Sequence, residues 1–301
     1  MTTLISHILL DIEGTTCPVS FVSGTLFPYA VRELGPFLER HQQEVKVQEL
    51  VATIFQDWQQ DPDPNAQQLF HNTAGQEIRG EEEESKDSRS ANVGKHKLIV
   101  PYLQWLISVD LKYTPLKELQ GMVWNEGYGR GELKSTLFDE VADTLQRWHE
   151  QGLVLGVYSS GSIAAQKLLY GHSQAGDLRP LFQYWFDTHI GSKHEVDSYR
   201  RICEAMQVNP QQVLFISDCE AELEAAVQSN LQVILSDREN EQPVSNNLNP
   251  QKPTTSIAAG TPRQVSRLDQ IELLTKDATH YQQGKHRQQD HLLGVEKSRP
   301  T

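Results

Sequence analysis

The chain has 301 residues, of which 38% are hydrophobic, and a formal net charge of −13. This length suffices for one large domain or two ordinary ones, whereas a mean hydropathy of −0.52 indicates that part of the chain is solvated. The negative charge argues against nucleic acid or an anionic membrane surface as a partner. A small phosphorylated substrate stays compatible, because a metal ion and one lysine can invert the local field.

The three cysteines, Cys17, Cys203 and Cys219, follow neither a metal-ligand nor a disulfide spacing. A reducing compartment is therefore the natural interpretation. The amino-terminal apolar run has no basic segment ahead of it and is too short for a signal peptide or a membrane span. We expect a cytoplasmic protein without a membrane partner, and we expect it to be a monomer.

The first predicted strand is the apolar run from Leu4 to Leu10, which ends on Asp11-Ile12-Glu13-Gly14-Thr15-Thr16. The carboxyl end of a strand in an open α/β sheet faces the crevice that binds ligands, so Asp11 is a candidate nucleophile. Glu13 points to the same side along extended backbone and can transfer protons in the same site. An ordinary acidic turn explains this hexapeptide alone equally well. The later motifs decide between a catalytic site and such a turn.

Residues 19–130 show helical periodicity rather than strand alternation. Apolar residues recur at intervals of three and four over residues 47–58, 98–107 and 116–123, which predicts an inserted helical module. Within it, residues 73–97 contain four consecutive glutamates and few apolar side chains. Such a segment cannot bury enough surface to offset its ordering entropy, so we expect a disordered loop there.

Two further apolar runs lead to a hydroxyl pair and to a lysine. Leu153–Tyr158 ends on Ser159 and Ser160 and continues into a helical pattern, so hydroxyl and backbone N–H groups there would face a phosphate. The run that ends at Phe186 leads through a glycine-containing loop to Lys193. Lysine is a compact charge for an anionic oxygen, so these residues are candidate substrate ligands.

The next apolar run, Val213–Ile216, ends on Ser217 and Asp218, with Glu220, Glu222 and Glu224 behind them. Asp218 is thus another acid at the end of a predicted strand. Carboxylate oxygens suit a hard divalent metal. Asp218 is therefore a candidate metal ligand.

The carboxyl-terminal part changes character after the strand predicted over Leu231–Leu235. Residues 238–262 are rich in Asn, Gln, Pro and Thr, and residues 277–301 are rich in Gln, His and Lys, so we expect both to be disordered. Between them, at 263–276, Leu268–Leu274 predicts a short helix docked on the core. The predicted organisation is a core at 1–18 and 131–237, a helical cap at 19–130, a linker at 238–262, a docking helix at 263–276 and a tail at 277–301.

The order Asp-x-acid-Gly-Thr, Ser, Lys and Asp, each after an apolar run, resembles the haloacid dehalogenase superfamily of aspartate-nucleophile phosphatases. Most members have Asp at the position of Glu13. A Glu at this position is similar to the motif of the enolase-phosphatases of methionine salvage. Further stretches, which bring the resemblance to about residues 4–236, are Leu26–Tyr29, Tyr158–Ser162, Ala165–Ser173, Phe186–Thr188 and Ser198–Arg200.

This resemblance implies an α/β fold with a doubly wound, Rossmann-like parallel sheet and an inserted α-helical cap. It implies a phosphoric monoester hydrolase that enolises 2,3-diketo-5-methylthiopentyl 1-phosphate and then removes its phosphate, giving acireductone. It also implies one Mg²⁺ per chain. The implied roles are Asp11 as nucleophile and metal ligand, Glu13 as proton donor and acceptor and as a metal ligand through its backbone carbonyl, Asp218 as metal ligand, and Ser159, Ser160 and Lys193 as phosphate ligands.

Several assignments stay open. The base for enolisation is either Glu13 or a group from the cap. Trp124, Tyr128 and Arg130 are candidates for contacts with the methylthio end, although core packing is the stronger interpretation for Trp124. The alternative functions are a general phosphosugar phosphatase of the same superfamily and a non-catalytic module that binds a phosphometabolite.

Overall fold

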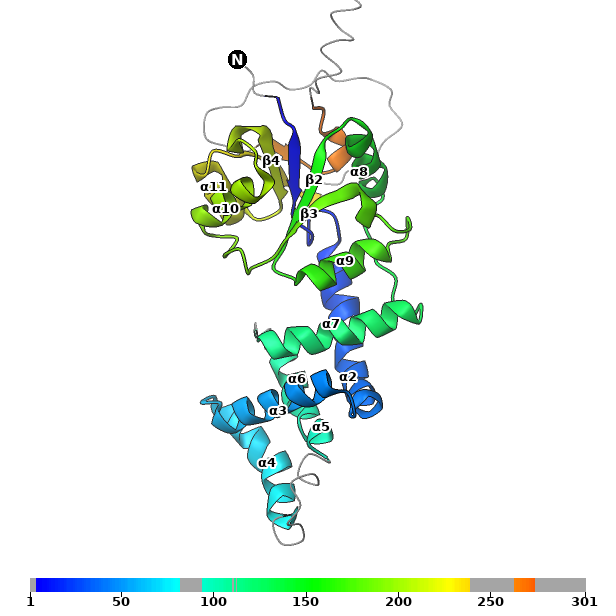
Figure 1. Cartoon of the computed structure of the whole chain (residues 1–301), viewed down its shortest axis with the longest axis vertical. Helices are drawn as coiled ribbons and strands as arrows, with labels where there is room; N and C mark the ends of the chain where they lie inside the picture. Colours follow the sequence, from blue (N-terminus) through cyan, green and yellow to red (C-terminus); the bar gives the residue numbers. More distant parts are fainter. Residues whose placement is uncertain (1–3, 82–93, 110, 112, 239–262, 274–301) are drawn as a thin grey trace, which may run out of the picture. The chain divides into compact units, whose positions relative to one another are not determined.

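The computed structural model describes residues 4–81, 94–109, 111, 113–238 and 263–273 (Figure 1). The chain divides into two compact units. The first, the core unit, is formed by Met1–Pro18 together with Thr136–Thr301. The second, the helical unit, is formed by Val19–Ser135.

The core unit is built on a six-stranded sheet whose paired strands are all parallel, in the order β3-β2-β1-β4-β5-β6. In the central strand, Leu10 lies opposite Val157 on one side and Ile216 on the other. The predicted α/β fold with a parallel sheet is confirmed. The strands are β1 (His7–Leu10), β2 (Val154–Tyr158), β3 (Phe182–Phe186), β4 (Val213–Ser217), β5 (Gln232–Ser236) and β6 (Arg263–Val265).

Helices cover both faces of this sheet (Figure 1), because each parallel strand needs a crossover connection to the next. On one face, Leu9 and Phe215 pack with Tyr199 and Leu223 from two helices. These helices are α10 (Val196–Met206) and α11 (Glu220–Gln228). The other face carries α8 (Val141–Glu150) and α9 (Ile163–Gly171), and the short 3₁₀ turns η3 (Arg179–Leu181) and η4 (Pro210–Gln212) lead into β3 and β4.

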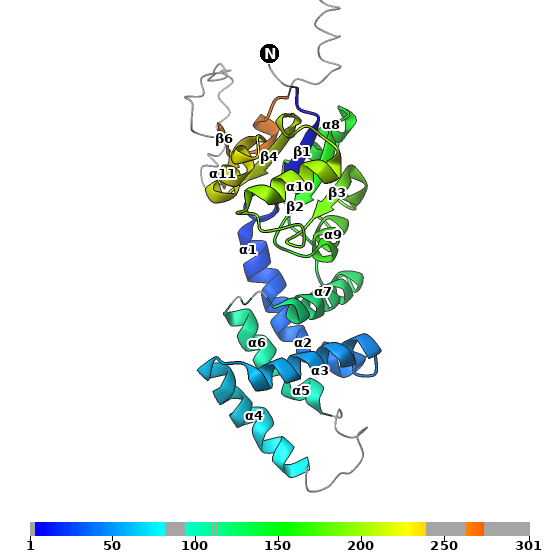
Figure 2. The same ribbon diagram turned by 60° about the vertical axis from the view of Figure 1, so that its left-hand side comes forward.

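The carboxyl-terminal segment differs from the predicted docking helix. It forms β6, orange in Figure 2, which pairs with β5, and then a single 3₁₀ turn, η6 (Leu268–Gln270). Leu268 is fully buried, so the segment does pack on the core. A helix this short is marginal in water, whereas the edge of β5 offers its backbone ready hydrogen-bond partners.

Arg238 also departs from the prediction, because it belongs to the structured core rather than to a disordered linker. Its side chain is 9% exposed and is held by the contacts described below. The rest of the predicted linker, residues 239–262, and the predicted tail from 277 lie outside the described residues.

The described residues of the helical unit form only helices and their connections. The six buried residues of α3 are those of the predicted stripe, Val47, Leu50, Val51, Ile54, Phe55 and Trp58. No helix in the described ranges is long and apolar enough to cross a membrane. The helices are α1 (Val19–Phe21), a π-helical turn η1 (Val22–Leu26), α2 (Phe27–His41), α3 (Val45–Gln60), α4 (Pro64–Glu81), α5 (Lys95–Leu98), α6 (Val100–Ser108) and α7 (Thr114–Gly129).

Helix occupies both ends of the segment 73–97, for which we expect disorder. The helix α4 continues to Glu81, and α5 begins at Lys95. Helix propagation from the well-packed start of α4 adds one backbone hydrogen bond per residue, which polar side chains do not prevent. Residues 82–93 lie outside the described residues.

Candidate active site

The predicted site residues of the core unit meet at the carboxyl edge of the sheet. Asp11 follows β1, and its backbone N–H donates to Ile216 O of β4 at 3.0 Å. Ser159 follows β2, and its N–H donates to Phe186 O of β3 at 3.2 Å. Asp218 follows β4. Because β1 lies between β2 and β4, Asp11 is flanked by Ser159 on one side and Asp218 on the other.

Residues 11–17 form a tight turn that we call the Asp11 loop. The Ile12 carbonyl accepts hydrogen bonds from the N–H groups of Thr15, Thr16 and Cys17 at 3.2, 2.9 and 2.9 Å. Gly14 has φ of +70°, and a Cβ added there would lie 1.9 Å from Asp218 Oδ2. The turn therefore requires glycine both for its backbone conformation and for the close approach of the Asp218 carboxylate.

Lys193 joins Asp11 to an acid to which the sequence analysis assigns no role. Lys193 Nζ lies 2.5 Å from Asp11 Oδ1 and 2.6 Å from Glu222 Oε2, and the three side chains are 8%, 7% and 11% exposed. Glu222 Oε2 also accepts a hydrogen bond from Ser217 Oγ at 2.8 Å. The signal in the sequence that could have identified Glu222 is its place four residues after Asp218, in the first turn of α11.

Two tyrosines hold the loop that carries Lys193. The Tyr199 hydroxyl donates to Lys193 O at 2.7 Å, and the Tyr158 hydroxyl donates to Gly191 O at 3.0 Å. Gly191 has φ of +141°, and a Cβ there would lie 2.1 Å from Ser198 Oγ. These contacts fix the backbone on both sides of Ser192, so the lysine side chain starts from a defined position.

Electrostatics at this edge are dominated by carboxylates. Burial opposes the charged form of Lys193, but the adjacent Asp11 and Glu222 charges outweigh it and raise the lysine pKa above its ordinary value. Asp218 is exposed as a residue. Partial desolvation, followed by the charges of Asp11 and Glu222, raises the pKa of Asp218 to about 6. Three acids thus act on one ammonium group, which leaves an excess of negative charge.

Ser159 and Ser160 differ in their surroundings. Ser159 is buried and its Oγ accepts the Gly161 N–H at 3.2 Å, whereas Ser160 is exposed. Ser162 caps α9 by accepting the Ala165 N–H at 3.3 Å. The two serines therefore precede a capped helix N-terminus, where the Ile163 N–H donates to Asp187 Oδ2 at 3.2 Å. The dipole of α9 favours an anion in front of this end.

Glu13 and Cys17 pair across the Asp11 loop through a parallel bridge. Burial, with a smaller contribution from the Glu13 charge, raises the pKa of Cys17 to about 12. A thiol that stays protonated is a poor nucleophile. All three cysteines of the chain are free, and these observations indicate a structural role for Cys17.

The donor set at the sheet edge fits a hard cation. Asp11 and Asp218 supply carboxylate oxygens beside a glycine turn. Burial is the largest cause of the raised pKa of Asp218, and the charges of Asp11 and Glu222 add to it. A divalent cation would balance those charges. No group of three or more His, Cys, Asp or Glu side chains in the described ranges is arranged as a metal site. Two carboxylates completed by a backbone oxygen and water are ligands that Mg²⁺ accepts.

The three cap residues considered for substrate contact are engaged within the helical unit. Trp124 Nε1 donates to Leu26 O at 2.9 Å. Tyr128 is buried and its hydroxyl lies 2.7 Å from Ser135 Oγ. Arg130 forms an ion pair with Glu126. These contacts account for all three side chains by interactions inside the unit and support core packing for Trp124.

Comparison with known proteins identifies similar chains. A sequence profile of haloacid dehalogenase-like hydrolases matches residues 5–230. Enolase-phosphatase E1 of Synechococcus sp. (strain CC9902) is 47% identical over 236 residues, which are 78% of this chain and 90% of that protein. Enolase-phosphatase E1 of Stenotrophomonas maltophilia (strain R551-3) is 41% identical over 88% of this chain and 98% of that protein. The crystal structure of the UTR4 protein of Saccharomyces cerevisiae has 27% identity and a TM-score of 0.61, covering 89% of this chain and 100% of that chain.

Proposed function

Because this chain belongs to the enolase-phosphatase E1 family of haloacid dehalogenase-like hydrolases, we propose that it converts 2,3-diketo-5-methylthiopentyl 1-phosphate to acireductone in methionine salvage. The reaction has two steps, enolisation of the diketone and removal of the phosphate. The observation that supports the second step most directly is the 2.5 Å contact between Asp11 and Lys193. It places a fixed cation beside the attacking carboxylate, where phosphoryl oxygens must lie.

In the proposed phosphate transfer, a carboxylate oxygen of Asp11 attacks phosphorus and the bond from phosphorus to the enediol oxygen breaks. Glu13 gives its proton to that leaving oxygen. Glu13 then takes a proton from the water that attacks the aspartyl phosphate, which releases inorganic phosphate and restores the Asp11 carboxylate. Both residues return to their starting protonation states.

Lys193 and Ser159 would hold the transferring oxygens, with Ser160 beside them. Support for Lys193 comes from its burial and from its two carboxylate partners, which keep the charge in place. Support for the serines comes from their position ahead of the capped N-terminus of α9. Glu222 would act indirectly by holding Lys193, since its carboxylate is shared between that lysine and Ser217.

We also propose that one Mg²⁺ binds per chain, held by the Asp11 and Asp218 carboxylates and the backbone carbonyl of Glu13. When bound, the cation would supply positive charge for the phosphate oxygens and for a substrate carbonyl. Asp218 is kept close to the Asp11 loop by the absence of a side chain at Gly14. The expected cytoplasmic location and monomeric state stay predictions.

The test is an assay of the purified chain with the diketone phosphate. Acireductone formation and phosphate release should both occur, should stop in EDTA and should return with Mg²⁺. Phosphosugars serve as comparison substrates, because a general phosphatase of the same superfamily would hydrolyse them with similar efficiency and would not enolise the diketone. Phosphate release without acireductone would contradict the proposed function.

A further inference from the structure

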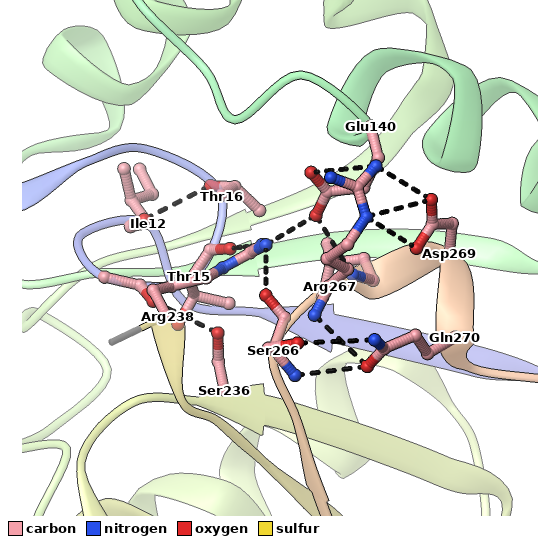
Figure 3. Close-up of polar contacts among 12 residues, drawn as sticks. Ile12, Thr15, Thr16, Glu140, Ser236, Arg238, Ser266, Arg267, Asp269 and Gln270 are labelled. Carbon is pink, nitrogen blue, oxygen red and sulfur yellow. Dashed lines mark hydrogen bonds and ion pairs between the residues drawn. The ribbon is translucent and has the colours of Figure 1, made fainter. Parts of the chain in front are cut away.

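The guanidinium group of Arg238 connects three segments that are distant in sequence (Figure 3). Its Nη2 donates to Thr15 O in the Asp11 loop. Its Nη1 donates to Glu140 Oε1 at 2.5 Å and to Ser266 O at 2.9 Å. The group lies 4.0 Å from the ring centroid of Phe138, which covers it from one side. Arg238 therefore has defined partners in the loop, before α8 and in the carboxyl-terminal segment.

The partners of Arg238 are themselves held in place. The side chain of Glu140 is 3% exposed, and its Oε1 also accepts the backbone N–H of Leu268 at 3.0 Å. Leu268 is fully buried in the turn that follows β6. A guanidinium presents its donors in a rigid fork. The direction in which Arg238 holds Thr15 is therefore set by Glu140 and by residues 266–268.

A second side chain holds the neighbouring carbonyl of the same loop. Ser236 Oγ, at the end of β5, donates to Gly14 O at 3.1 Å. The bonds to the Ile12 carbonyl close the turn on itself, whereas the bonds from Ser236 and Arg238 attach the turn to the sheet. Two successive carbonyls are thus fixed within a few residues of Asp11.

We propose that Arg238 is a positioning residue for the nucleophile. It acts through the Thr15 carbonyl on the placement of the Asp11 loop, and Glu140 with residues 263–271 forms the frame that holds it. This inference rests on the proposed role of Asp11 as nucleophile. A displacement of about 1 Å in a catalytic group can lower the rate on the order of 10²-fold, so the loss of this donor should be visible in turnover.

The primary test compares Arg238→Ala and Arg238→Lys with the wild type, well below their thermal midpoints. Turnover of the diketone phosphate and of p-nitrophenyl phosphate should both fall about 10- to 100-fold in Arg238→Ala, with KM changed by less than about threefold. Arg238→Lys should retain an intermediate kcat. Guanidinium added to Arg238→Ala should restore part of the lost kcat, because it can occupy the vacated place.

The matched control is Leu231→Ala, a buried core residue that precedes β5 and lies outside the frame of Arg238. This variant loses buried apolar volume and thermal stability, but it keeps Glu140, residues 263–271 and every donor of Arg238. Its kcat should stay within about threefold of the wild type. If the control variant loses as much kcat as Arg238→Ala, general destabilisation explains the loss in both variants and the proposal is overturned.

Amide hydrogen exchange supplies a readout that does not depend on turnover. Exchange over residues 11–17 should become faster in Arg238→Ala and stay near wild-type rates in Leu231→Ala. Unchanged exchange and kcat in folded Arg238→Ala would overturn the positioning role. If Arg238→Ala does not fold, the same kcat and exchange measurements are made on Arg238→Lys and Ser236→Ala and are judged by the same criteria. A wild type inactive on the diketone phosphate would instead refute the proposed function, while the exchange measurement would still decide on Arg238.

Discussion

Lys193 and Asp11 form a buried ion pair, with 2.5 Å between Nζ and Oδ1, across a separation of 182 residues in the sequence. The same ammonium group also contacts Glu222. Removing its charge would leave two largely buried carboxylates without their shared counter-ion. This relationship makes Lys193 important for both the fold and the proposed reaction.

Lys193→Met keeps the length of the side chain and removes its charge. We expect kcat to fall on the order of 10²- to 10³-fold, because a charge beside the transferring oxygens is lost. Unfolding in denaturant should show a loss of about 3–5 kcal/mol, as for other broken buried pairs. Lys167→Met, at an exposed lysine of α9, is the control and should leave both quantities unchanged. A Lys193→Met enzyme with near wild-type turnover would exclude the phosphate-binding role.

Asp11→Asn should abolish turnover, because an amide cannot form the aspartyl phosphate. Mass spectrometry should detect no acid-stable phosphate adduct on the variant chain after quenching with substrate. The far-UV circular dichroism spectrum should match the wild type, since the Asp11 backbone bond to Ile216 O is retained. Substantial phosphatase activity in a preparation free of wild-type chain would show that the nucleophile lies elsewhere.

Substitutions of Glu13 test the proton transfer. Glu13→Asp shortens the side chain by one methylene, and Glu13→Gln can neither donate nor accept the proton. Both should lower turnover of the diketone phosphate, the first on the order of 10²-fold. Transfer from p-nitrophenyl phosphate should be less affected, because its leaving group needs little protonation. Wild-type rates of enolisation and phosphate release in Glu13→Asp would mean that the length of this side chain is incidental.

The pKa of Asp218 predicts that wild type and Asp218→Asn differ in stability without metal, by an amount that depends on pH. The pKa of Asp218 is about 6, above the ordinary value of about 3.9, so the folded chain binds this proton more tightly than the unfolded chain. Its stabilising contribution is present below the unfolded pKa and is lost as the pH rises through the folded pKa.

Asp218→Asn should therefore raise the thermal midpoint in EDTA at about pH 7.5 and change it little near pH 4. In Mg²⁺ the same variant should lose turnover, because a proposed metal ligand is removed. Differential scanning fluorimetry at both pH values checks the first expectation. A lower midpoint at the higher pH would show that Asp218 stabilises the metal-free fold when charged.

Two glycines of α7 should respond oppositely to alanine. A Cβ at Gly127 would lie 2.5 Å from Tyr29 Oη, whereas a Cβ at Gly121 meets nothing within 4 Å. Gly127→Ala should destabilise the protein by about 1–3 kcal/mol through overpacking. Gly121→Ala should stabilise it by about 0.5–1 kcal/mol through helix propensity. Urea unfolding of the pair checks both signs, and stabilisation by Gly127→Ala would show that the Tyr29 ring can move away.

The inner strands of the core could be predicted from sequence because each is an apolar run that ends abruptly on a polar residue, whereas their parallel arrangement was implied by the resemblance to the haloacid dehalogenase superfamily. Those endings also located Asp11, Ser159 and Asp218, since strand ends of a parallel sheet share one edge. Lys193 was found because a single cation follows one such run. Local pattern thus located the strand ends, and the family resemblance supplied their arrangement in one sheet.

Glu222 and Arg238 show what local pattern does not carry. Glu222 is one of three acids on α11, and only the register of that helix against Lys193 distinguishes it from Glu220 and Glu224. Arg238 is the first residue of a polar stretch, so its sequence surroundings are those of the linker that we expect at 238–262. Its partners lie at Thr15, Glu140 and Ser266, and a strand as short as β6 has too few residues for alternation to be visible.

The contacts of Ser236 and Arg238 with the Asp11 loop also set an order of events during synthesis. The loop is synthesised before its anchors, which follow 222 and 223 residues later, and the segment that holds Arg238 is made after those. A ribosome-bound chain that ends before residue 263 would expose the edge of β5 and leave Glu140 without the Leu268 N–H. Phosphatase competence should therefore arise only after residues 263–271 have been synthesised.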